Sequence, residues 1–268
     1  MGMRYSSIVK VAMYTALVFV ATIILQIYIP ATRGYFNLGE ASIYVIALLL
    51  TPLSAGIAAG VGSALADVVT GYGIFAPGTL VIKFAEGFMV SYLARILSAK
   101  PLSYVKYLSV LTSTFVGMVI SIVGIFKLSG IAELSSIPID LLGFRAILLS
   151  GRVVISWHIW VIIGATITLI LLYLALVKGR ENVSLALSML TGGLVMVFGY
   201  FMYEYFFTNP IIYGAPPEQA FVEVPVNFGQ VFVGLSVALP ITSFISKAVG
   251  GSGSTKYKGS KSKLSVKR

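Results

Sequence analysis

The sequence contains no cysteine and a single histidine among 268 residues. Without cysteine there is no disulfide, no thiol nucleophile and no thiolate ligand for zinc or an iron–sulfur cluster. The one histidine, His158, cannot form a histidine-rich metal site, and we expect a structural role for it. The motifs H-E-x-x-H, G-x-S-x-G and the G-x-x-x-x-G-K-[ST] phosphate loop are also missing. We therefore predict no metal site, no cofactor and no enzymatic activity.

Charged residues are scarce, at 10% of the chain, whereas hydrophobic residues make up 58% and the mean hydropathy is +0.97. A soluble domain is about a quarter charged, so this balance excludes an ordinary cytosolic fold. The charges bracket uncharged runs, several of them longer than the roughly 18 residues that indicate a membrane-spanning helix. The segments of about 10 residues with alternating polarity that build an outer-membrane barrel are absent. The composition predicts an all-α polytopic membrane protein.

The uncharged runs predict about eight transmembrane spans. The dipeptide Thr51-Pro52 divides one run into two helices, the first of them short. The stretch Lys127–Arg152 has mixed charge and is expected to be an external loop with room for an interfacial helix. The expected spans are Val11–Pro30, two helices within Ala41–Ala66, Thr79–Leu97, Tyr107–Phe126, Val153–Val177, Val183–Tyr203 and Val224–Ser246.

The positive charges predict the orientation. The net charge is +10, and the segment from Lys256 to Arg268 is rich in lysine and free of acidic residues. In a membrane protein such a tail indicates the cytoplasmic side, and we do not expect nucleic-acid binding. With the N-terminus inside, 14 Lys and Arg residues lie in cytoplasmic segments and four in external ones. We expect a multi-pass plasma-membrane protein with both termini cytoplasmic, a single transmembrane domain over residues 1–249, and a disordered basic tail over residues 250–268.

Polar residues in the predicted spans are the candidates for function, because a charge at the bilayer centre costs about 2.5–3.5 kcal/mol on insertion scales. They fall in the outer halves of the spans and in the first external loop, and we expect them to form one outward-opening pocket. Aromatic residues among them suit a flat heteroaromatic ring. The candidates are Arg33, Tyr35, Asn37, Glu40, Asp67, Tyr72, Lys83, Glu86, Tyr200, Tyr203, Glu204, Asn227 and Gln230.

Structural alternatives exist for several candidates. Lys83 and Glu86 lie three residues apart on one helix face and can neutralise each other. The two tyrosines of the seventh span can belong to an interfacial aromatic belt. The small residues Gly56 and Gly60 are four apart, which favours close packing of helices within the protein. Ala12 and Ala16 repeat this spacing in the first span, where the pattern alone is weak.

Seven blocks of sequence together resemble the substrate-binding S components of energy-coupling factor (ECF) transporters, and among these the riboflavin-type and related vitamin S components. They occur in the family's order within residues 5–97 and 187–247. The blocks are Gly34–Ala41, Thr51–Gly56, Gly62–Asp67, Gly71–Pro77, Thr79–Gly87, Gly199–Glu204 and Val224–Gln230. Members of the family have six helices, so residues 104–180 resemble an insertion with two added spans. Glu40 stands where the family commonly has an aspartate.

The resemblance implies a mechanism. An S component captures a vitamin-like molecule from outside, and a separate transmembrane coupling subunit with two ABC-type ATPases drives its toppling and the release of the substrate. Ala12 and Ala16 resemble the family's docking motif for the coupling subunit. The alternative is a stand-alone secondary transporter in which Lys83, Glu86 and Asp67 relay protons, although no internal repeat supports it. The substrate stays open among riboflavin, thiamine precursors, pyridoxine and similar heteroaromatics.

Overall fold

A computed structural model describes residues 2–30, 32–134, 137–141, 144–148, 151–177 and 180–250. Over these residues the chain forms eight α-helices, six short strands, a π-helical segment and a 3₁₀ turn. In chain order they are α1 Gly2–Ile23, β1 Leu25–Ile29, β2 Gly34–Asn37, α2 Gly39–Leu49, α3 Pro52–Thr70, α4 Ala76–Ala99, α5 Leu102–Lys127, β3 Gly130–Leu134, β4 Ile137–Leu141, β5 Phe144–Leu148, β6 Gly151–Ile155, α6 Trp157–Val177, α7 Arg180–Tyr203, η1 Glu204–Ile212, η2 Pro217–Gln219 and α8 Ala220–Gly250. The predicted tail lies outside the described residues from residue 251 onward.

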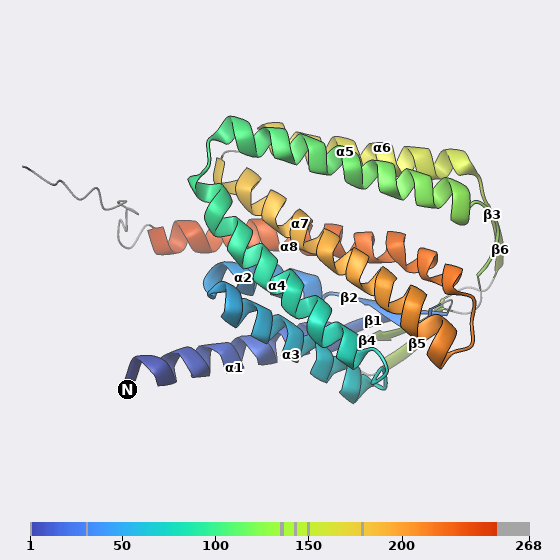
Figure 1. The fold of residues 1–268 in the computed structure, drawn as a ribbon, viewed down its shortest axis with the longest axis horizontal. Helices are drawn as coiled ribbons and strands as arrows, with labels where there is room; N and C mark the ends of the chain where they lie inside the picture. Colours follow the sequence, from blue (N-terminus) through green and yellow to red (C-terminus); the bar gives the residue numbers. More distant parts are fainter. Residues whose placement is uncertain are drawn as a thin grey trace, which may run out of the picture.

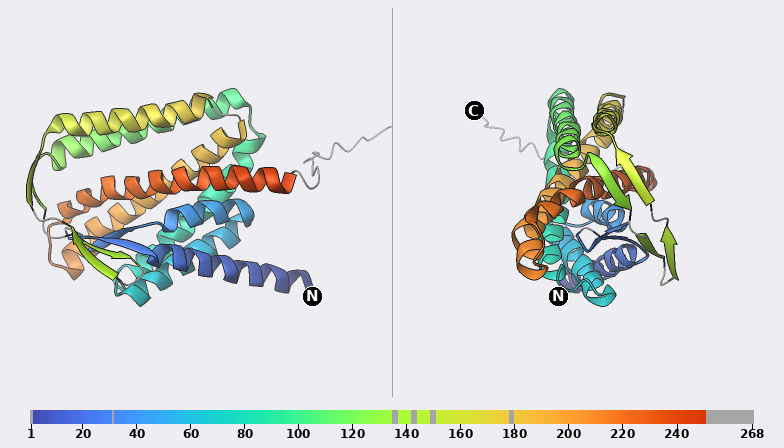
Figure 2. Two further views of the ribbon diagram at one scale, coloured as in Figure 1. Left: turned by 180° about the vertical axis from the view of Figure 1, so that it is seen from behind. Right: turned by 90° about the vertical axis from the view of Figure 1, so that its right-hand side faces the viewer.

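The helices run roughly lengthwise between two ends of the molecule (Figure 1). At one end α1 begins, α8 ends and the turn between α4 and α5 lies; we call this the terminal end. At the other end lie the strands and η1, and we call this the hairpin end (Figure 1, Figure 2). The start of α1 and the finish of α8 therefore share one side of the molecule.

The protein is a helical membrane protein. Four stretches of the described residues are long and apolar enough to cross a bilayer: Pro52–Thr70, Leu102–Lys127, Asn182–Ile212 and Pro217–Ile245. Large apolar side chains such as Val61, Phe115 and Phe244 are exposed on the outside of the bundle, where lipid would cover them. With 11 residues, α2 is too short to cross by itself, at about 1.5 Å of rise per residue. The count of eight spans stays a prediction.

Six helices, α1–α4 with α7 and α8, pack into a common core. Small residues bring α3 against α4. A Cβ added to Gly60 would lie 2.5 Å from the Leu80 carbonyl oxygen, and one added to Gly56 would lie 2.9 Å from the Phe84 carbonyl oxygen. The prediction that these two glycines serve packing within the protein is confirmed.

The helices α5 and α6 form a pair of their own along one side of this core (Figure 1, Figure 2). Glycine again permits the approach, because a Cβ on Gly117 would lie 2.6 Å from the Gly164 carbonyl oxygen. α5 also contacts α7 and α8. The two helices predicted between residues 104 and 180 are therefore present, as an antiparallel pair joined by strands at the hairpin end.

The chain is predominantly helical, as expected, but the hairpin end also contains short strands that the sequence did not predict. The helix expected over Val11–Pro30 ends at Ile23, and Leu25–Ile29 forms strand β1, which pairs with β2 as a hairpin. Isoleucine and tyrosine favour extended backbone, and the proline at position 30 blocks continuation of a helix.

The loop expected between Lys127 and Arg152 also differs, because its described residues after α5 form strands where an interfacial helix was expected to have room. β4 pairs with β1 on one side and β5 on the other, so that the four-stranded order is β2-β1-β4-β5, and β3 pairs with β6. Residues Val153–Ile155, expected to begin a span, belong to β6, and α6 begins at Trp157. The pairing of β4 with β1 joins segments more than 100 residues apart, which local sequence patterns do not reveal.

Candidate ligand-binding site

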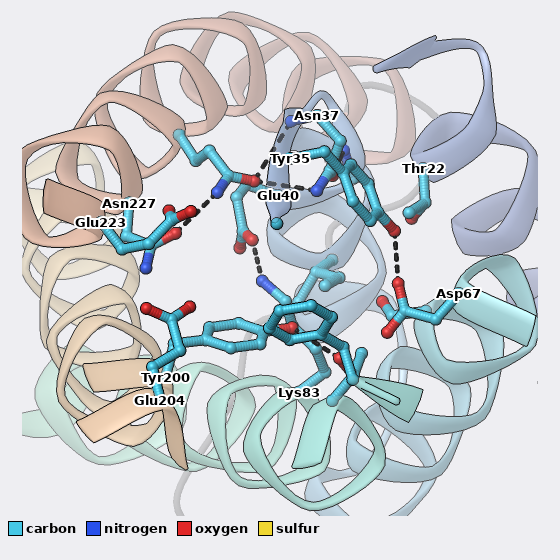
Figure 3. A pocket seen from close by; sticks show the side chains of 17 residues that line it. Thr22, Tyr35, Asn37, Glu40, Asp67, Lys83, Tyr200, Glu204, Glu223 and Asn227 are labelled. Carbon is cyan, nitrogen blue, oxygen red and sulfur yellow. Dashed lines mark hydrogen bonds and ion pairs between the residues drawn. The ribbon is translucent and has the colours of Figure 1, made fainter. Parts of the chain in front are cut away.

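A small cavity lies within the six-helix core at the hairpin end, bounded by strand β2 (Figure 3). Its volume is about 40 Å³, room for water-sized molecules only. Polar residues dominate its wall and come from segments far apart in the chain. The lining residues are Thr22, Gly34, Tyr35, Asn37, Gly39, Glu40, Ile43, Ser63, Asp67, Phe75, Thr79, Lys83, Tyr200, Glu204, Glu223, Asn227 and Gln230.

Lys83 of α4 is the single basic residue among the described residues that line the cavity. Its ammonium group forms ion pairs with Glu40, at the start of α2, and with Glu86, 3.1 Å away on α4. All three side chains are buried. The ring of Tyr200 lies 5.5 Å from Lys83 Nζ, which adds a cation–π contact. The ion pair of Lys83 with Glu86 agrees with the structural alternative for these two residues, and the structure adds Glu40 from a different helix.

Asp67 and Tyr35 meet on another wall of the cavity. The Tyr35 hydroxyl donates a hydrogen bond of 2.5 Å to Asp67 Oδ1, which links strand β2 to α3. Burial raises the pKa of the Tyr35 phenol well above its usual value, so this hydroxyl stays neutral and acts as the donor. The ring of Tyr72 packs against Tyr35 with centroids 4.3 Å apart. A tyrosine pair thus covers the carboxylate from the hairpin side.

Three amides form a chain of hydrogen bonds from β2 to α8. Asn37 Nδ2 donates to Gln230 Oε1 at 2.9 Å, and Gln230 Nε2 donates to Asn227 Oδ1 at 2.8 Å. The backbone N–H of Gly39 donates to Asn37 Oδ1, which sets the direction of the whole chain. Because Asn227 uses its oxygen as the acceptor, its Nδ2 group is left to donate at the cavity wall.

Two further glutamates lie beside Asn227 (Figure 3). Glu204 is the first residue of the π-helical segment η1, and Glu223 lies in the first turn of α8, where it accepts a hydrogen bond from the Thr32 hydroxyl. π-helical turns are uncommon and often occur at functional sites. Both carboxylates are buried, and Figure 3 shows them on the side of the cavity opposite Asp67 and Tyr35.

Comparison with known proteins shows the family. Residues 3–153, just over half of the chain, match the family model described as "ECF-type riboflavin transporter, S component". The chain belongs to this family. The match to the S-component family covers α1–α5, strands β1–β5 and the start of β6, and so it extends into the segment predicted to be inserted. As members of that family are binding and transport proteins, this chain is a membrane transport component.

A protein of Pyrococcus woesei, described as an uncharacterized protein in a gap 3′ region, is 40% identical to this S component over 105 residues. The alignment covers 39% of the chain and 66% of the relative, just under two thirds of the relative's length. No solved structure matches.

Nine of the residues predicted to form the S component's pocket do line the cavity, and four do not. Arg33 is exposed on the β1–β2 turn, where its guanidinium lies 4.3 Å from the ring centre of Tyr213. Tyr203 donates to the Ile74 carbonyl at 2.8 Å and packs against Gly78. Tyr72 packs against the lining residue Tyr35, and Glu86 forms an ion pair with the lining residue Lys83. The role of all thirteen in binding stays a prediction.

Sequence reasoning missed Glu223 and several smaller lining residues. The predicted eighth span begins at Val224, four residues after the start of α8, and so leaves out Glu223. Glu223, Asn227 and Gln230 are spaced by four and three residues, so they share one helix face, and this spacing could have revealed the glutamate. Thr79, which receives the Tyr200 hydrogen bond at 3.0 Å, lies one turn before Lys83 on its face. Thr22 and Ser63 gave no signal, because single hydroxyls are common in membrane helices.

Among the described residues no group of three or more His, Cys, Asp or Glu residues is placed to hold a metal ion. The predicted docking pair lies away from the cavity: Ala12 and Ala16 are exposed on α1, beside the exposed apolar side chains of Met13 and Leu17. A partner helix could therefore reach them without disturbing the pocket.

Proposed function

We propose that this protein is the S component of an ECF-type transporter and that the cavity at the hairpin end is where it captures a vitamin-like molecule from outside the cell. The observation that carries the proposal is the convergence of buried polar side chains from β2, α2, α3, α4, η1 and α8 on one cavity. Buried polar groups without a full set of partners are costly, so a fold retains them where a ligand uses them. Membership of the S-component family supports the same role.

The substrate is proposed to be riboflavin or a related heteroaromatic molecule. The family description names riboflavin, and Tyr35, Phe75 and Tyr200 provide aromatic faces for a flat ring. Sites for molecules of this size are typically about 300–1,000 Å³, far larger than the cavity of about 40 Å³. Entry of a heteroaromatic therefore requires the wall to move.

We propose that the protein crosses the plasma membrane eight times with both termini in the cytoplasm. β2 and α2 together run from the hairpin end back to the terminal end. We therefore count the short α2 together with β2 as one crossing of the membrane. The hairpin end then faces outward and the exposed Ala12–Ala16 face of α1 lies nearer the cytoplasm. A coupling subunit docked there, with two ABC-type ATPases, would supply the energy.

Binding itself is tested with Asn227→Ala, which removes the donor at the end of the amide chain. The probes are riboflavin and thiamine, titrated against purified protein. We expect whichever probe binds to lose about tenfold or more in affinity, because an amide removed from a ligand contact costs on the order of 1–3 kcal/mol. Asn182→Ala is the matched control, since Asn182 accepts from Ser243 at 2.9 Å near the terminal end. Equal affinities in the two variants would place the site elsewhere.

The transport mode is tested by uptake into proteoliposomes of radiolabelled riboflavin and thiamine. We expect ATP-dependent uptake when the coupling subunit and both ATPases are present, and none with this protein alone. Uptake by this protein alone, driven by a proton gradient, would establish the secondary transporter in which Lys83, Glu86 and Asp67 relay protons.

A further inference from the structure

The cavity carries an excess of carboxylates. Four glutamate and aspartate side chains line it, against the single ammonium group of Lys83. Lys83 is already paired twice, with Glu40 and with Glu86. The remaining carboxylates, those of Asp67, Glu204 and Glu223, face the cavity with no cation among the described lining residues to balance them.

Hydrogen-bond acceptors are left over at the same place. Four buried oxygen atoms have no hydrogen-bond partner among the described residues. They are Glu40 Oε2, Asp67 Oδ2, Glu204 Oε2 and Ser63 Oγ. Each of these residues lines the cavity. The two tyrosine hydroxyls of the wall already donate within the protein, Tyr35 to Asp67 and Tyr200 to Thr79, whereas Asn227 Nδ2 is left to donate. Acceptors and negative charge therefore exceed donors and positive charge at the cavity.

The shortage of positive charge and hydrogen-bond donors is greatest on one side of the cavity. Figure 3 shows Glu204, Glu223 and Asn227 together at one edge of the cavity, with Lys83 held between them and the opposite wall. The nearest basic residue on the hairpin, Arg33, is exposed and lies over Tyr213, outside the set of lining residues. A buried carboxyl group needs a counter-charge or donors to stay ionised, because it has lost its hydration.

We propose that the molecule bound here is a cationic heteroaromatic whose positively charged, donor-bearing group lies against the carboxylates of Glu204 and Glu223. The aromatic part lies across the cavity, within reach of Tyr200 and Tyr35. This inference rests on the proposed function, which it narrows: the substrate is an amine-bearing or quaternary nitrogen heterocycle, and a neutral flavin fits less well. A neutral molecule would leave these carboxylates without a counter-charge.

The first experiment compares ligands that differ in charge, by titration of the full-length protein purified in detergent. Pyridoxamine and pyridoxine differ by one amine in place of one hydroxyl, so they form a matched pair. Thiamine, a fixed cation, is compared with neutral riboflavin. We expect the cation to bind at least tenfold more tightly in each pair that binds. Equal or tighter binding of the neutral member would overturn the charge proposal and leave the proposed function standing.

The second experiment removes one carboxylate without changing its shape. Glu204→Gln should weaken binding of the cation at least tenfold and change the affinity for the neutral counterpart much less. Glu218→Gln is the control, because Glu218 is exposed on η2 and does not line the cavity. A Glu204→Gln protein that binds the cation as well as Glu218→Gln does would also overturn the proposal.

Mass spectrometry of the molecule that co-purifies with the protein completes the test when none of the four probes binds. A molecule with a positive charge at pH 7 supports the inference, and a neutral or anionic one overturns it. Absence of any co-purifying molecule together with no binding of the probes would count against the proposed function itself, and the charge inference would fall with it.

Discussion

At the scale of single residues, Lys83 holds the buried charges of the core together. It joins α4 to the beginning of α2 through Glu40 while also pairing with Glu86 on its own helix. Its side chain is buried, so both ion pairs are largely removed from bulk solvent. Removing one member of a buried ion pair leaves an uncompensated charge, which is more costly than replacing the whole set with neutral groups.

We therefore expect Lys83→Met to destabilise the protein by about 3–5 kcal/mol. The triple variant Lys83→Met, Glu40→Gln, Glu86→Gln should recover part of that loss, because no charge is left unpaired. Thermal unfolding in detergent measures both. If the triple variant unfolds at a lower temperature than Lys83→Met, the ion pairs do not contribute in this way.

At the scale of elements, α1 has two different faces. Val18 and Thr22 are buried towards the core, and Thr22 reaches the cavity. Ala12 and Ala16 are exposed one helical turn apart, where small side chains leave a shallow strip for another helix. A single helix thus connects the proposed docking strip with the wall of the pocket.

We expect the double variant Ala12→Leu, Ala16→Leu to bind thiamine or riboflavin as the unaltered protein does and to lose co-purification with the coupling subunit. The larger side chains hold a partner helix away without adding charge. A pull-down measures assembly and a ligand titration measures binding. Ala165→Leu, an equal enlargement at an exposed position of α6, is the control. Normal assembly of the double variant would show that the strip is not the docking site, and loss of binding would show that it supports the fold.

At the scale of the whole molecule, the two ends differ in chemistry. The terminal end carries exposed Lys100 at the α4–α5 turn, and the hairpin end carries the buried acidic residues of the cavity. The excess of Lys and Arg in the segments at the terminal end supports the proposal that this end is cytoplasmic, by the positive-inside tendency.

The orientation is testable because the chain has no cysteine of its own. Single cysteines at Ser103, exposed at the start of α5, and at Glu218, exposed at the hairpin end, should react from opposite sides of the membrane. We expect a membrane-impermeant maleimide added to intact cells to label Glu218→Cys and to label Ser103→Cys only after the cells are opened. The reverse pattern would invert the protein and place the cavity on the cytoplasmic side.

The sequence by itself determined the membrane class, the approximate positions of the helices and the polar residues worth considering. Long uncharged runs satisfy their backbone hydrogen bonds as helices in lipid, so composition alone predicts them. The cost of a charge in the bilayer singled out Lys83, Glu86 and Asp67 before any contact was known. Sequence blocks also indicated the S-component family that the comparison then showed.

Only the tertiary structure decided which of these residues meet. The pairing of Lys83 with Glu40, the amide chain from Asn37 to Asn227 and the inclusion of Glu223 each join segments that are distant in sequence. The same holds for strand β4, which pairs with β1 and extends the hairpin into a sheet. Such contacts depend on how the helices pack and on where their ends come together, and no local pattern of residues encodes that packing.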